Sequence, residues 1–242
     1  MKNTEIIFVI DKSGSMAHLA GDTIGGFNGF IESQKTLEGK STLTTVLFDS
    51  SYKILHDNVD INEVKPMTGV DYIAGGGTAM LDAIGDVINK VQDRHDELGS
   101  EKPDNVLFVI TTDGEENSSR SFNKKQIEKM IKHQTNGHGW KFMFLGANMD
   151  AVKEAADIGI SRDWSTNYAY TSSGVRAAYD TVTCVSKAIS TDSLDGVLSV
   201  ATEYANCEAQ SNGAKTYTDC EAFADGKIAA INTNVSALSL SI

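Results

Sequence analysis

The chain contains few cysteines and no long hydrophobic run near its amino terminus. Its three cysteines, Cys184, Cys207 and Cys220, are odd in number and lack CxxC spacing, so we expect neither a disulfide framework nor a zinc site. Reduced thiols favour a cytoplasmic protein. The apolar run Ile6–Ile10 is too short for the core of a signal peptide or for a membrane span. We therefore expect a cytoplasmic chain with no membrane partner.

Basic residues are outnumbered by acidic ones. The 242 residues include 21 Lys and Arg against 33 Asp and Glu, which gives a formal net charge of -12. Such a chain repels a phosphate backbone unless it carries a strong basic patch. The one basic cluster, Lys124-Lys125 with Lys129 and Lys132, has helical spacing around Glu128 and is typical of a solvated helix face. Nucleic acid is therefore not an expected partner.

The motifs of common catalytic sites are also absent from the sequence. It contains no Gly-x-Ser-x-Gly nucleophile elbow and no Gly-Lys-Ser/Thr phosphate loop. None of the five histidines stands in a motif that pairs it with a Ser or Cys nucleophile. We therefore assign no catalytic residue and no organic cofactor, and we expect a protein that is not an enzyme.

The chain does contain an alternation of short apolar runs with stretches of helical spacing. Four continuous apolar runs predict strands buried on both faces: Ile6–Ile10, Val46–Phe48, Val106–Ile110 and Phe142–Leu145. Tyr52–Leu55 follows the second run after the turn-like Asp49-Ser50-Ser51 and predicts an antiparallel edge hairpin.

Apolar stripes with helical spacing lie between and after these runs. The predicted helices carry the stripes Leu19–Ile31, Met80–Val91, Ile127–Ile131, Ala151–Ile158 and Val175–Ile189. Asn123 and Gln126 form an N-cap pair for the third helix. Strands that alternate with helices predict an α/β fold with a doubly wound, mostly parallel sheet flanked by helices and one antiparallel edge strand.

The pattern weakens after about residue 195. We therefore expect one domain over residues 1–195 and a carboxyl-terminal extension over residues 196–242, which is rich in Ser, Thr, Asn and Ala. A short helix around Cys220–Ile231, an extra hairpin and a partly ordered tail all fit this composition.

Three polar segments stand where a predicted strand ends or a predicted helix begins. The segment Asp11–Ser15 follows the first strand, Asp113 follows the third, and Thr78 opens the second helix after three glycines. Because the loops at the carboxyl ends of parallel strands meet where the strand order reverses, we expect these segments to converge. Each alone also fits a turn or a helix cap. Together their hydroxyl and carboxylate oxygens are hard ligands that suit Mg²⁺ or Mn²⁺.

In this order the segments resemble the metal-ion-dependent adhesion site of von Willebrand factor A domains, and the resemblance extends over roughly residues 5–189. It implies a Rossmann-like fold. It also implies that Ser13, Ser15 and Thr78 are coordinating hydroxyls, and that Asp11 and Asp113 are direct or water-mediated ligands.

Softer similarity to bacterial and phage members of this family lies in Asp71-Tyr72, in Asp113–Asn117 and in Phe144–Asn148. Glu115 and Glu116 of the second segment are expected to be solvated loop residues rather than metal ligands.

These residues lead us to expect a non-enzymatic, Mg²⁺-dependent protein-binding module. An ion held largely by neutral hydroxyls keeps most of its charge, so a partner's Asp or Glu is the natural further ligand. One alternative is a phage structural or assembly component, which would bind virion proteins and be associated with the virion. Another is the target-binding subunit of a AAA+ ATPase in a bacterial or phage-infected cell. A Mg²⁺-dependent phosphohydrolase with Asp11 as nucleophile is disfavoured, because such enzymes usually carry a second carboxylate where this chain has Ser13.

Overall fold

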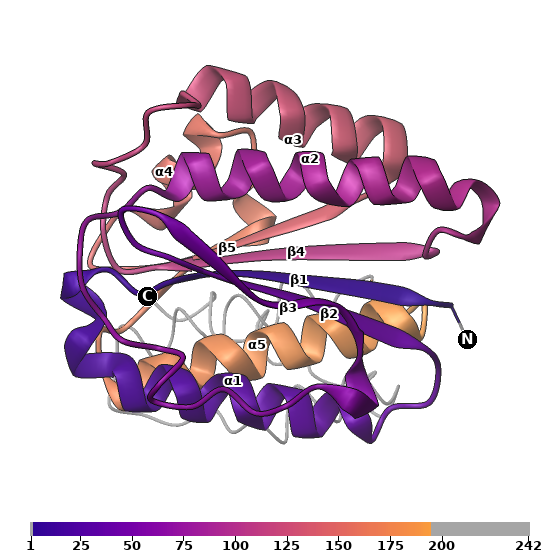
Figure 1. Cartoon of the computed structure of the whole chain (residues 1–242), viewed down its shortest axis with the longest axis horizontal. Coiled ribbons are helices and arrows are strands. Elements are labelled where there is room, and N and C mark those ends of the chain that lie inside the picture. The colour runs from indigo at the N-terminus through magenta and orange to yellow at the C-terminus, as the bar shows by residue number, and fades with distance from the viewer. Residues whose placement is uncertain (1, 195–242) are drawn as a thin grey trace, which may run out of the picture.

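A six-stranded sheet lies between two layers of helices in the computed structural model, which describes residues 2–194 (Figure 1). The strands stand in the order β3-β2-β1-β4-β5-β6. Their bounds are β1 Thr4–Asp11, β2 Ser41–Phe48, β3 Tyr52–Asp60, β4 Asn105–Thr112, β5 Lys141–Ala147 and β6 Ser165–Tyr168. All neighbouring strands pair in parallel except β2 and β3, which form an antiparallel hairpin at one edge. The doubly wound, mostly parallel sheet and its antiparallel edge strand are therefore confirmed.

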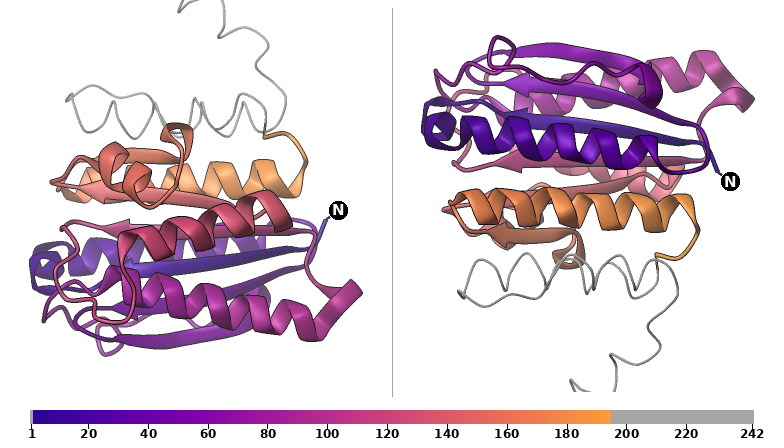
Figure 2. Two further views of the ribbon diagram at one scale, coloured as in Figure 1. Left: turned by 90° about the horizontal axis from the view of Figure 1, so that it is seen from above. Right: turned by 90° about the horizontal axis from the view of Figure 1, so that it is seen from below.

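The helices cover both faces of this sheet (Figures 1 and 2). Helices α1 (Ala20–Lys35) and α5 (Ser172–Ser190) pack on one face, while α2 (Met80–Leu98), α3 (Lys124–His138) and the short α4 (Ala151–Asp157) pack on the other. Four 3-10 turns complete the described chain: η1 Gly14–Leu19, η2 Ile61–Glu63, η3 Gly99–Glu101 and η4 Arg162–Trp164. Of the helices that the structure describes, none combines the length and apolarity needed to cross a bilayer.

Strand β6 was not predicted from the sequence. Its residues, Ser165–Tyr168, are four in number and mostly polar, so no apolar run marks them. Ser165 and Thr166 are nevertheless buried, because β6 pairs with β5 and extends the sheet at the edge opposite β3. The capping box of Asn123 and Gln126 at the start of α3, in contrast, is present as expected.

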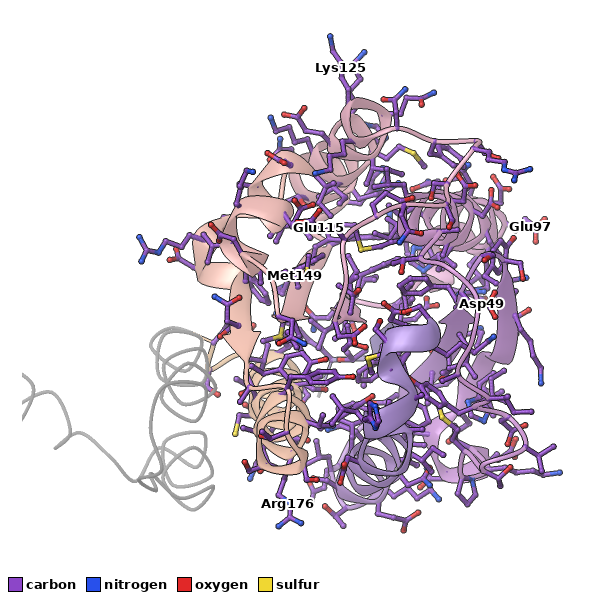
Figure 3. All side chains as sticks on the ribbon, turned by 90° about the vertical axis from the view of Figure 1, so that its left-hand side faces the viewer. Asp49, Glu97, Glu115, Lys125, Met149 and Arg176 are labelled. Atoms are coloured by element: carbon purple, nitrogen blue, oxygen red, sulfur yellow. The ribbon has the colours of Figure 1, made fainter. Side chains whose placement is uncertain are left out.

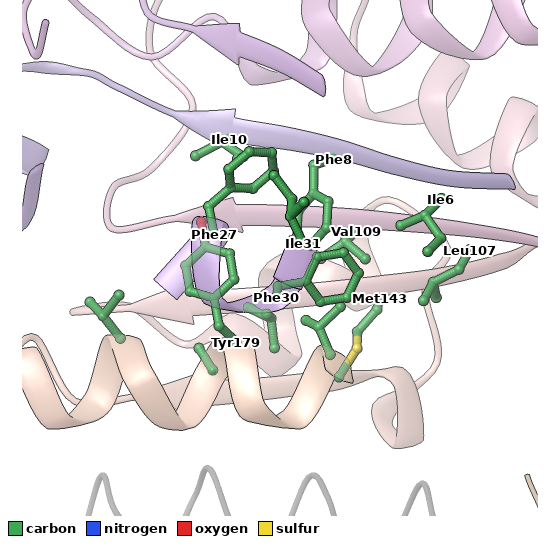
Figure 4. Packing of buried hydrophobic residues seen from close by; sticks show 14 of the residues in the cluster. Ile6, Phe8, Ile10, Phe27, Phe30, Ile31, Leu107, Val109, Met143 and Tyr179 are labelled. Atoms are coloured by element: carbon green, nitrogen blue, oxygen red, sulfur yellow. The ribbon is translucent and has the colours of Figure 1, made fainter. Parts of the chain in front are cut away.

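Strand β1 lies in the middle of the sheet and divides the core in two. Its side chains alternate, so Phe8 and its even-numbered neighbours face α1 and α5, while Ile7 and Val9 face α2 and α3. On the first face the Phe8 ring meets the rings of Phe27 and Phe30 edge-on, with centroids 5.5 and 5.0 Å apart (Figure 4). Because both faces are covered, β1 reads as one continuous apolar run.

Replacing Gly26 by Ala should destabilise the domain, because an added Cβ would lie 2.4 Å from a ring carbon of Tyr179. That ring is buried and its centroid lies 6.0 Å from that of Phe8, so moving it away from a new methyl group would disturb the core. We expect the free energy of unfolding to fall by about 1–3 kcal/mol, measured by urea denaturation. Gly25→Ala in the same helix is the matched control, since no atom lies within 4 Å of the new methyl group. It should stabilise α1 by up to about 1 kcal/mol. Similar effects of the two substitutions would contradict the close approach of α1 to α5.

Candidate metal centre

Backbone hydrogen bonds join the first two polar segments at the carboxyl end of the sheet. The Gly75 amide donates to the carbonyl oxygen of Lys12 over 2.9 Å, and the Gly14 amide donates to that of Gly76 over 3.2 Å. Gly76 has a φ of 73°, and a Cβ there would lie 2.9 Å from Ser50 Oγ, so a glycine suits this position. Loops whose bonded residues are 62 and 63 positions apart in the sequence are thus held side by side, as expected from the strand order.

The second and third segments are joined in the same way. The Asn117 amide donates to the carbonyl oxygen of Thr78 over 3.1 Å, and the Thr78 amide donates to Asn117 Oδ1 over 2.9 Å. Thr78 itself is buried and lies two residues before α2, which begins at Met80. Its hydroxyl does not cap the helix, so it is free of the structural role that the sequence also allowed.

The hydroxyl and carboxylate side chains of these loops converge. Ser13 Oγ lies 3.1 Å from Ser15 Oγ, and the Ser15 hydroxyl donates to Asp113 Oδ1 over 2.6 Å. A methyl group placed on Gly114 would lie 3.8 Å from both Ser15 Oγ and Thr78 Oγ1, so these two hydroxyls face a common point. The structure therefore gathers oxygens from all three predicted segments.

Asp11 has a different environment from Asp113. Its side chain is completely buried, and both of its carboxylate oxygens accept hydrogen bonds. Oδ1 accepts from the Ser13 amide and Oδ2 from the Thr112 hydroxyl, each over 2.6 Å. Burial raises the pKa of Asp11 to about 6, although the hydrogen bonds to its carboxylate oppose this shift. Asp11 thus shapes the loop that carries Ser13 and Ser15.

Asp113 has one carboxylate oxygen with no hydrogen-bond partner. Its Oδ1 accepts from Ser15, but Oδ2 is buried and unpaired within the described part of the chain. Burial raises the pKa of Asp113 as well. A carboxylate that has one buried, unpaired oxygen and contacts a serine hydroxyl with the other fits a hard divalent cation. Within residues 2–194 no group of three or more His, Cys, Asp or Glu side chains is placed to hold a metal ion elsewhere.

Three tyrosine hydroxyls donate hydrogen bonds to backbone carbonyl oxygens at the candidate metal centre, and the sequence did not indicate this role. The Tyr72 hydroxyl donates to the carbonyl oxygen of Asp11, and the Tyr170 hydroxyl donates to that of Ser15. Tyr168 reaches the carbonyl oxygen of Thr112 over 3.5 Å. Tyr72 lies in the Asp-Tyr pair that resembles bacterial proteins, but the two others lie on or beside the unpredicted strand β6.

The loop after Asp113 is fastened to the start of α2 by two carboxylates. Glu116 accepts hydrogen bonds from the amides of Leu81, Ser118 and Ser119, and Asp82 accepts from the amides of Arg120, Ser121 and Phe122. The expectation that Glu116 is solvated is therefore wrong, because its half-buried carboxylate accepts from one amide at the start of α2 and from two amides of its own loop. Glu115 is exposed, as expected. Figure 3 looks onto this end of the molecule and labels Glu115 and Asp49.

Comparisons with known proteins show the fold. No family model and no curated protein matches the chain. Among solved structures, the von Willebrand factor domain of the type V pili tip protein Mfa5 from Porphyromonas gingivalis matches 79% of this chain and 96% of its own, with 10% identity and a TM-score of 0.51. Manganese-loaded TRAP protein from Plasmodium vivax matches 73% of this chain and 71% of its own, with 16% identity and a TM-score of 0.51.

A third structure, the ArnB paralog VWA2 from Sulfolobus acidocaldarius, matches 75% of this chain with 14% identity and a TM-score of 0.51. The match covers 45% of that structure, and this chain likewise spans less than half the length of several others that it matches. Identities this low speak for the architecture and not for a shared activity. The chain therefore contains a domain with the von Willebrand factor A fold.

Proposed function

We propose that the three loops hold a Mg²⁺ or Mn²⁺ ion, and that through it the chain binds the carboxylate of an Asp or Glu on a protein partner. The observation that carries this proposal is the buried Oδ2 of Asp113, which has no partner among the described residues. The other oxygen of this carboxylate accepts from the Ser15 hydroxyl, which lies 3.1 Å from the Ser13 hydroxyl. A cation is the simplest group that would compensate such an oxygen. Thr78 would complete the set of hydroxyls, and Asp11 would act through Ser13 or through water.

The chemistry of this set favours adhesion. When bound, the ion would supply a positive charge that three neutral hydroxyls leave largely uncompensated. The chain's own residues would orient it, with Asp11 fixing the Ser13 amide and Asp113 providing the negative charge. The manganese-loaded state of TRAP and the pilus-tip role of Mfa5 support a metal-dependent protein-binding function on this fold.

The geometry of Asp11 argues against a phosphohydrolase. A nucleophilic carboxylate must present one free oxygen to the phosphorus atom. Both oxygens of Asp11 accept hydrogen bonds, and the side chain is 0% exposed. We therefore propose a binding function without turnover.

Replacing Ser13 and Ser15 by Ala should weaken Mn²⁺ binding at least about tenfold, because two of the proposed ligands are lost. Isothermal titration calorimetry with MnCl₂ and with MgCl₂ measures the affinity directly. Ser118→Ala is the matched control, since this hydroxyl lies in the loop that follows Asp113, donates to the adjacent Asn117 and is outside the proposed ligand set. Undiminished Mn²⁺ binding by the double variant would refute the site.

The affinity for Mn²⁺ should rise with pH between about 5 and 7, because the ion binds ionised carboxylates. Burial raises the pKa of Asp11 from its ordinary 3.8 to about 6 and raises that of Asp113 in the same direction. In the metal-free chain, the stability that Asp11 contributes is full below pH 3.8 and is lost as the pH rises through 6. Calorimetry and urea denaturation across this range test both trends. An affinity that does not change with pH would contradict the assignment of these carboxylates.

Capture of a partner from host lysate should require both the ion and its ligands. A protein held by the immobilised chain in Mg²⁺ should be released by EDTA and should not be held by Ser13→Ala/Ser15→Ala. The Ser118→Ala chain should capture it as well as the wild type. Capture that is equal in Mg²⁺, in EDTA and with the double variant would mean that the partner binds elsewhere.

A further inference from the structure

Two large apolar side chains lie exposed in the loop that leads from β3 to α2. Val70 is 82% exposed and Ile73 is 67% exposed. The other large hydrophobic side chains that are exposed in residues 2–194, Tyr52 and Leu98, reach only 40% and 37%. Single exposed hydrophobic residues are common, but two such residues three positions apart on one loop form a small apolar surface.

The loop that carries them is well anchored. The Thr68 amide and hydroxyl donate to Asp71 Oδ2 over 3.0 and 2.6 Å, and the Asp71 amide donates back to the Thr68 carbonyl oxygen. Asn28 of α1 exchanges two hydrogen bonds with the backbone of Met67. Val70 therefore projects from an ordered turn, and its exposure does not arise from a loose loop. An apolar group presented in this way loses little conformational entropy when a partner covers it.

The same loop is tied to the candidate metal centre on both sides of Ile73. The Tyr72 hydroxyl donates to the Asp11 carbonyl oxygen, and the Gly75 amide donates to that of Lys12 over 2.9 Å. Two residues of chain span at most about 7 Å, so the backbone of Ile73 lies within about that distance of Gly75, whose amide is bonded to the loop that carries Ser13. A partner segment that reaches the centre would pass within a few residues of this surface.

Two lysines near this surface have acidic partners within the chain. Lys12 forms an ion pair with Asp49, and Lys53 lies 4.0 Å from Asp71. These lysines are thus engaged within the chain, and what the loop offers a partner at Val70 and Ile73 is apolar contact.

We propose that Val70 and Ile73 form an apolar contact surface that selects the partner of the metal centre. The partner segment would carry an Asp or Glu and, within about four residues of it, a large apolar side chain that packs on this surface. The inference rests on the proposed function, because it adds an apolar side chain to the partner's Asp or Glu as a second feature that the site recognises. It predicts that acidic segments without a neighbouring apolar residue bind poorly.

Selection from a displayed library of random 12-residue peptides on the immobilised full chain, in Mg²⁺, tests the inference. The peptides enriched by the wild type should contain Asp or Glu with a large apolar residue nearby, and EDTA should release them. Selection on Val70→Ser/Ile73→Ser should keep the acidic residue and lose the apolar one. A synthetic copy of an enriched peptide should bind this variant roughly tenfold more weakly than the wild type.

Two controls separate this inference from the proposed function. Leu98→Ser removes an exposed apolar side chain beside Asn3 and Thr4, at the opposite end of the sheet, and should leave peptide binding unchanged. Val70→Ser/Ile73→Ser should unfold at the same temperature as the wild type, because the replaced side chains are mostly solvated.

The outcomes are distinct. If acidic peptides selected on Val70→Ser/Ile73→Ser still carry the apolar residue, the inference is overturned. It is also overturned if acidic peptides selected on the wild type carry no such residue. Both outcomes leave the metal-dependent function intact. Peptides that lack an acidic residue and bind equally in EDTA or to Ser13→Ala/Ser15→Ala would overturn the proposed function and the inference with it.

Discussion

The parallel pairing of β1 with β4 is the constraint on which the candidate metal centre depends. Ile10 stands opposite Thr111, which brings the Thr112 hydroxyl onto Asp11 and leaves Asp113 next to the loop of Ser13 and Ser15. A slip of one residue would turn every β1 side chain to the other face of the sheet. Since β1 is buried on both sides, such a slip would also destroy both halves of the core. The packing of the sheet and the position of the site are therefore set by one register.

Bringing the three loops together removes two carboxylates from water, which costs folding free energy. Asp11 and Asp113 are both buried, and burial favours their protonated forms. Asp11 is compensated by the Ser13 amide of the loop that follows it and by the Thr112 hydroxyl at the end of β4, whereas Oδ2 of Asp113 has no partner among the described residues. The fold thus holds one acidic oxygen ready at the meeting point of three loops, which is the physical basis of the function proposed for it.

The central strands and the position of the site could be predicted from the sequence, because a strand that is buried on both faces consists of consecutive apolar residues. Ile6–Ile10 and Val106–Ile110 marked the central strands, and the polar residues directly after them marked the end of the sheet where loops meet. Strand β6 left no such mark, since its pairing uses backbone groups and its residues are polar. The contacts of Tyr168, at the end of β6, and of Tyr170 beyond it depend on the direction of their side chains, and so does the exposure of Val70 in its loop. No periodicity encodes those directions, so they could be learned only from the structure.

The carboxylates at the start of α2 have a consequence for the electric field at the site. A helix of 19 residues carries a partial positive charge at its amino-terminal end, and the α2 amino terminus adjoins Thr78. Left alone, this macrodipole would attract anions and repel a cation from the adjoining loops. Glu116 and Asp82 place two negative charges on the first amides of the helix and of the loop beside it. They screen the dipole, so the helix start can stand next to a place suited to a cation without opposing it.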